Sequence, residues 1–105
     1  MSGKTRRQQL EEMLADEPND PFLRYGVAME CVSEGKDQEA ADRFRDIVAL
    51  APDYVPAYHQ AGQTLVRLGR AQEAGGVLRQ GIQAAQRQGN FHAAEEMQAL
   101  LDSLG

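Results

Sequence analysis

The fold is set by residues 21–54, PFLRYGVAMECVSEGKDQEAADRFRDIVALAPDY, and by residues 55–88, VPAYHQAGQTLVRLGRAQEAGGVLRQGIQAAQRQ, which match at a spacing of thirty-four residues. Glycines, alanines, small residues and bulky apolar residues coincide in register: Gly35 with Gly69, Ala40 with Ala74, Ala28 with Gly62, and Phe44 with Leu78. A fixed period of this size indicates a repeat protein, in which each repeat is one supersecondary unit stacked on the next.

The composition favours helices. The chain has 105 residues, enough for one domain with a modest core, and 42% of them are hydrophobic. Alanine, leucine, glutamine, glutamate and arginine dominate, whereas β-branched and aromatic residues are sparse. We therefore predict an all-α fold.

No apolar run is long enough to span a membrane, so we expect no membrane association. The N-terminus is basic without an apolar stretch behind it, which argues against a secretory signal. A single cysteine permits no internal disulfide and fits a reducing compartment. These features predict a cytoplasmic protein.

The net charge of −5 is unevenly distributed. Residues 1–54 carry twelve acids and seven bases, residues 55–90 one acid and four bases, and residues 91–105 three acids and no base. The four arginines of the middle block form either a positive strip or an ordinary solvated surface: Arg67, Arg70, Arg79 and Arg87. The overall negative sign argues against nucleic acid as the ligand, because binding phosphates requires clustered positive charge.

Helical periodicity and punctuation divide the chain into six helices. They are Thr5–Asp16, Pro21 to about Glu34, Asp37–Leu50, Pro56 to Gly69, Ala71 to about Gln88, and Phe91–Leu104. Asp20 and Asn90 stand where N-caps are expected, and Gly35 and Gly69 end the helices that precede them. The short turns force neighbouring helices into antiparallel hairpins. Gly75, Gly76 and Gly81 lie inside the fifth helix, where we expect close approach of neighbouring helices.

These matches resemble the tetratricopeptide repeat. In that family each repeat is a helix pair with small residues at the crossing and a proline after the second helix, as at Pro52 and Pro18 here. The resemblance implies an α-solenoid of antiparallel helix hairpins: a half repeat at 5–18, repeats at 21–54 and 55–88, and a capping helix at 90–104. Two positions depart from the family pattern. At the position of the family's early tryptophan, repeat 21–54 has Arg24 and repeat 55–88 has Tyr58. At the position of the closing proline, repeat 55–88 has Gln86, so the fifth helix should continue for a further turn.

The resemblance also implies a binding surface. The first helix of each pair lines the concave face in this family, which here places seven residues on it: Phe22, Tyr25, Met29, Ser33, His59, Gln63 and Arg67. Such a patch suits a peptide or helix with an apolar anchor and an acidic group. Alternatively, these side chains fold onto neighbouring helices. The lysine and asparagine that bind chaperone tails in some family members are absent from the matching positions, which argues against that ligand.

Catalysis and metal binding have little support. Cys31 and His59 could form a nucleophile pair, but Cys31 lies on the apolar stripe, where a cysteine usually acts as a small hydrophobe. His92 with Glu95 or Glu96 has helical spacing for two metal ligands but lacks a third. We expect no enzyme activity, no metal and no cofactor.

The sequence therefore predicts a protein–protein interaction module with a scaffold or adaptor role. The alternative is a self-assembly module that associates, at least weakly, through its terminal helices. In that alternative Leu10, Met13 and Leu14 are exposed at one end of the stack.

Overall fold

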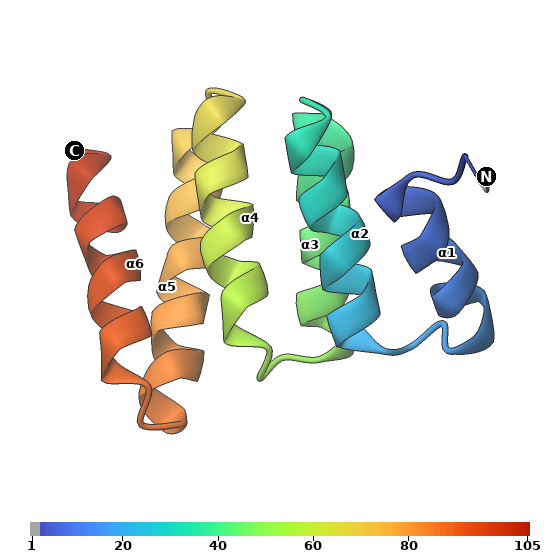
Figure 1. The fold of residues 1–105 in the computed structure, drawn as a ribbon. Helices are drawn as coiled ribbons and strands as arrows, with labels where there is room; N and C mark the ends of the chain where they lie inside the picture. The colour runs from blue at the N-terminus through green and yellow to red at the C-terminus, as the bar shows by residue number, and fades with distance from the viewer. Residues whose placement is uncertain (1–2) are drawn as a thin grey trace.

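A computed structural model describes residues 3–105, and within this range the chain forms six α-helices and no strand. The helices are α1 (Arg6–Asp16), α2 (Pro21–Ser33), α3 (Asp37–Leu50), α4 (Val55–Arg67), α5 (Ala71–Arg87) and α6 (Phe91–Ser103). Each helix packs against the next, with α2 beside α3 and α4 beside α5 in the middle of the stack (Figure 1). The result is a slab of 48 × 29 × 20 Å with α1 and α6 at its two ends. The predicted all-α helical repeat is confirmed.

The predicted helix ends are present. Asp20 caps α2, because its carboxylate accepts hydrogen bonds from the backbone N–H groups of Phe22 at 2.9 Å and Leu23 at 3.2 Å. The side chain of Asn90 accepts one from the backbone of Ala93 and caps α6. Gly35 and Gly69 follow α2 and α4 with φ angles of 75° and 77°, in the left-handed region that glycine enters without strain.

The core consists of buried clusters that follow one another along the stack. Its middle section joins three helices through buried residues: Ala28 and Cys31 of α2, Ala40, Phe44 and Ile47 of α3, and Ala57 and Ala61 of α4. Its C-terminal section joins α4, α5 and α6 through Val55, Tyr58, Leu78, Ile82, Ala85, Ala94 and Met97. Tyr58 also donates a hydrogen bond to the carbonyl of Pro52 at 2.8 Å, which satisfies its hydroxyl.

Two glycines allow helices to approach closely. A Cβ atom at Gly62 would lie 2.5 Å from Leu78 Cδ2, and one at Gly81 would lie 2.5 Å from Tyr58 Cβ and 2.6 Å from Met97 Sδ. Close approach therefore explains Gly81. It does not explain Gly76, which is exposed with nothing within 4 Å of a Cβ, or Gly75, where the contacts are of ordinary length.

The position of α1 corrects one expectation. Leu10 is buried against Leu23 and Val27, so it is not exposed at the end of the stack. Gly26 of α2 leaves room for the Leu10 side chain, since a Cβ atom at position 26 would lie only 3.2 Å from Leu10 Cδ1. Leu14 is partly buried beside it, whereas Met13 is 54% exposed.

The fifth helix is longer than the third, at 17 residues against 14. It passes Gln86 and ends at Arg87, which confirms that the absence of a proline lets it run on. Among the residues that the structure describes, no helix is long and apolar enough to cross a membrane.

Candidate functional site

Three of the seven predicted surface residues line one pocket between α1 and α2. This pocket has a volume of about 220 Å³. Its walls are formed by Arg6 and Leu10 of α1 and by Phe22, Tyr25, Gly26, Met29 and Glu30 of α2. The α2 residues share one side of their helix because they are spaced three and four apart.

Phe22 is the most exposed apolar residue of the pocket, with 70% of its surface accessible. It lies in the first turn of α2, which Asp20 fixes through its capping hydrogen bonds. An aromatic ring of this size left in water on a capped helix is available to a partner, because burying it removes a large apolar area.

The Tyr25 side chain is held in place by two aromatic neighbours. Its ring centroid lies 5.7 Å from that of Phe44 and 5.5 Å from that of Tyr54, with both pairs tilted. Burial raises the pKa of Tyr25, Tyr54 raises it further, and a hydrogen bond with Gln60 opposes the rise. Tyr25 and the neighbouring Met29 both pack against the core between α2, α3 and α4. Tyr25 and Met29 therefore pack partly on neighbouring helices, which agrees in part with the alternative to an open binding surface.

The other four predicted residues lie outside this pocket. Ser33 is exposed at the end of α2. His59 and Gln63 are half-buried on α4, with their Nε2 atoms 3.3 Å apart.

Arg67 is exposed at the end of α4, but it is engaged. Its guanidinium lies 3.4 Å from the Asp37 carboxylate and donates a hydrogen bond to Thr64 Oγ1 at 3.1 Å. The carboxylate of Asp37, at the start of the neighbouring helix α3, thus partly neutralises the positive charge of Arg67.

An arginine at the N-terminal end organises a charge cluster that the sequence interpretation missed. Arg7 donates hydrogen bonds to Glu11 at 2.7 Å and to Glu34 at 2.8 Å, and it also binds Glu39. Its hydrogen bond holds the pKa of Glu34 below its usual range, and hydrogen bonds from Arg43 and Arg7 do the same for Glu39. Only the Arg7–Glu11 and Glu39–Arg43 pairs, each four residues apart, are visible as patterns in the sequence.

The structure does not support a nucleophile pair. Cys31 is fully buried in the core cluster with Ala40 and Phe44, and burial is the main cause that raises the pKa of its thiol. His92 is exposed and lies 3.4 Å from Glu96. Within residues 3–105, no three or more histidine, cysteine or acidic side chains are grouped as metal ligands would be.

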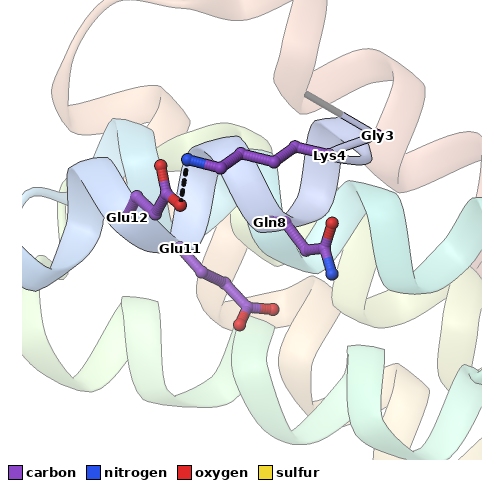
Figure 2. A pocket seen from close by; sticks show the side chains of 5 residues that line it. All are labelled: Gly3, Lys4, Gln8, Glu11 and Glu12. Carbon is purple, nitrogen blue, oxygen red and sulfur yellow. Dashed lines mark ion pairs between the residues drawn. The ribbon is translucent and has the colours of Figure 1, made fainter. Parts of the chain in front are cut away.

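A second hollow lies on α1 itself and is polar. It has a volume of about 460 Å³ and is lined by Gly3, Lys4, Gln8, Glu11 and Glu12. Figure 2 shows Lys4 reaching along the helix to Glu12, with an N–O distance of 2.6 Å, while Glu11 points to the other side. The charges of this hollow are already engaged, because Lys4 pairs with Glu12 and Glu11 pairs with Arg7.

No protein-family model and no curated protein matches the chain. Solved structures do. The solution structure of a tetratricopeptide repeat domain protein from Salinibacter ruber is 32% identical, with a TM-score of 0.78, over 83% of this chain and 88% of that one. The crystal structure of such a protein from the same organism is also 32% identical, with a TM-score of 0.76, over 81% and 96% of the two chains. A Bordetella parapertussis protein is 26% identical, with a TM-score of 0.82, over 96% and 88%.

The stacked hairpins, the glycine contacts between helices and these matches define an all-α helical repeat protein. The chain belongs to the tetratricopeptide repeat family, as its identity with the Salinibacter ruber protein over most of both chains shows. Domains of this kind are typically non-catalytic modules for protein interaction, which points to protein partners in general.

Proposed function

We propose that this chain is a scaffold or adaptor module that binds a peptide or a partner helix on the surface carried by α2 and α4. One observation carries the proposal. Phe22, 70% exposed, stands at the edge of a pocket whose walls include the half-buried Tyr25 and Met29. Aromatic side chains, phenylalanine included, are enriched at the core of protein interfaces relative to the rest of the surface.

The three side chains have complementary roles in this proposal. Phe22 supplies apolar area that a ligand would bury. Tyr25 supplies a rigid face held by Phe44 and Tyr54. Met29 is flexible and polarisable, so it adapts to the shape of the bound side chain.

The polar residues would set the preference for the partner. An acidic group on the ligand would compete with Asp37 for Arg67, and this exchange is inexpensive because the existing pair is exposed and its N–O distance is 3.4 Å. His59 and Gln63 would donate or accept hydrogen bonds along the peptide, and Ser33 would do so at the end of α2.

The proposal is tested with peptides selected from a displayed random library on the wild-type chain. Their dissociation constants are then measured for Phe22→Asp and for a matched control, Phe91→Asp, in which an aromatic residue 66% exposed on α6 is changed. We expect Phe22→Asp to weaken binding about tenfold or more, because burial of a phenylalanine contributes about 1.5–3 kcal/mol. Equal binding by wild type and Phe22→Asp, or loss with Phe91→Asp instead, would refute this surface.

Self-assembly through the terminal helices has less support than peptide binding. The eighth residue of α2 is Ala28 and that of α4 is Gly62, which leave room for the next helix, but the eighth residue of α6 is the exposed Gln98. A long side chain there obstructs a further helix from packing as α5 packs on α4. The outer side of α6 also carries acids without a base.

A further inference from the structure

The cleft between α3 and α4 is filled by the helix that precedes them. Tyr25 of α2 packs on Phe44 of α3 and on Tyr54, which directly precedes α4, and Gln60 of α4 is close enough to affect the pKa of Tyr25. Ala28 and Cys31 of α2 share the buried cluster with Phe44 and Ala40. In a complete repeat, therefore, a first helix occupies the cleft between its second helix and the first helix of the next repeat.

The pocket between α1 and α2 is the same cleft one repeat earlier. Subtracting the thirty-four-residue period converts Ala40, Phe44 and Gln60 into Arg6, Leu10 and Gly26, all of which line the pocket. The pocket remains open in residues 3–105, although three of its lining positions correspond to residues around the cleft that α2 occupies one repeat later.

Exposure along α1 supports this correspondence. Met13 corresponds to Ile47, which is fully buried beneath α2, yet Met13 is 54% exposed. Phe22, on the opposite wall, is 70% exposed. Two large apolar side chains are thus left uncovered on either side of the cleft in which a helix is seated one repeat later.

We propose that the groove between α1 and α2 is the seat of an amphipathic helix of a partner protein, which completes the N-terminal repeat by lying antiparallel to α1. The seated helix needs a small residue where it crosses Leu10, as Ala28 crosses Phe44, and an apolar residue over Met13. It also needs an acidic residue near its C-terminus, next to Arg6.

Charge fixes the direction of the seated helix. Arg6 lies at one end of α1 and is 71% exposed in its side chain, with Glu30 at 3.7 Å, while Asp16 and Glu17 lie at the other end. A helix antiparallel to α1 places its negative C-terminal end near Arg6 and its positive N-terminal end near the two carboxylates. Both contacts are favourable to its dipole.

This inference deepens the proposed function and rests on it, because Phe22 and Met29 belong to both surfaces. It adds α1 to the surface and restricts the ligand to a helix.

The probe is a synthetic peptide with the sequence of residues 20–35, held helical by a staple on its solvent side and carrying Cys31→Glu to face Arg6. Its affinity for the full chain is measured by fluorescence anisotropy. We expect Met13→Asp to weaken binding about tenfold, because the substitution replaces apolar area that the seated helix would bury with a charge. Leu50→Asp is the matched control, because Leu50 is 43% exposed on α3 and lies outside the groove. The Leu50→Asp variant should bind the peptide as tightly as the wild type does. A Cys31→Lys peptide should bind more weakly than the Cys31→Glu peptide.

Three outcomes would overturn the proposal. One is no binding of the probe, and another is equal binding by wild type and Met13→Asp. The third is concentration-dependent association of the chain that Met13→Asp abolishes and Leu50→Asp preserves, which would make a second copy the occupant. The randomly selected peptides separate this proposal from the broader one. If they still require Phe22 but not Met13, the surface on α2 and α4 stands and the helix seat fails.

Discussion

The two ends of the stack are built differently. At the C-terminal end, Met97 of α6 is fully buried and sits where Gly81 leaves room beside Tyr58. At the N-terminal end, α1 has a single buried residue, Leu10, and its other ties to the stack include the ion pairs of Arg7. One end is thus held by apolar packing, and the other combines a small apolar contact with charges.

This difference is the reason that the proposed interaction surface is placed at α1 and α2. Apolar packing anchors the C-terminal end through the buried Met97, although Phe91 is 66% exposed there beside a hollow of about 230 Å³ between α5 and α6. The thin contact between α1 and α2 leaves a pocket open and two apolar side chains, Met13 and Phe22, uncovered. Charges fix the position of α1 without filling the space beside it.

The largest expected effect is at Met97. Met97→Ala should destabilise the whole chain by about 2–5 kcal/mol, because it leaves a cavity at the centre of the C-terminal core. Leu10→Ala should loosen α1 while leaving the unfolding of the remaining helices nearly unchanged. Urea unfolding followed by circular dichroism measures the first effect, and amide exchange in α1 measures the second. A loss of global stability as large in Leu10→Ala as in Met97→Ala would show that the two ends are equally integrated.

Gly81 should be the next most sensitive position. Gly81→Ala places a Cβ 2.5 Å from Tyr58 Cβ, which lies next to the backbone and cannot rotate away. We expect a net loss of about 1–3 kcal/mol from overpacking, despite the better helix propensity of alanine. Thermal unfolding checks this, and an unchanged or higher midpoint would mean that α4 and α5 are not in close contact there.

Gly76 is the control in the same helix. It is exposed, has helical φ, and nothing lies within 4 Å of an added Cβ. Gly76→Ala should therefore stabilise the chain by about 1 kcal/mol through helix propensity alone. The opposite signs expected for Gly76→Ala and Gly81→Ala separate packing from propensity, and a destabilised Gly76→Ala variant would contradict this assignment.

The smallest expected effect is a weaker attachment of α1 at acidic pH. The pKa values of Glu34 and Glu39 are lowered in the folded chain from an ordinary value of 4.5. Their contribution is therefore present above that pH and is lost as the pH falls through the lower folded values. The attachment of α1 should weaken at about pH 3.5 relative to about pH 7 in wild type, and less so in Arg7→Gln. Amide exchange of α1, corrected for its intrinsic pH dependence, measures the difference. An equal response in both chains would show that Arg7 does not carry it.

The sequence predicts much of the backbone because the signals are local. The Asp20 cap, the left-handed Gly35 and Gly69, and the extended fifth helix each depend on residues within one or two turns. The thirty-four-residue match supplies the stacking of the hairpins, since equivalent residues in repeats occupy equivalent positions.

The site was less predictable because its contacts join residues far apart in the chain. The pairing of Arg67 with Asp37 and of Arg7 with Glu34 depends on which helix ends meet, and no local pattern specifies this. The burial of Leu10 depends on Gly26, which becomes informative only when α1 is placed across it. The correspondence of Leu10 with Phe44 was nevertheless available in the repeat period and would have indicated both the burial and the pocket.

The most direct test of the proposed interaction surface is to map a bound peptide on the chain. Backbone amide shifts of the isotope-labelled chain are followed by NMR during titration with a peptide selected from a random library. We expect the shifted amides to lie around Phe22, Met29 and the facing side of α1, while the amides around Phe91 and Gln98 on α6 keep their shifts. Shifts centred on α5 and α6, with α2 unaffected, would contradict it.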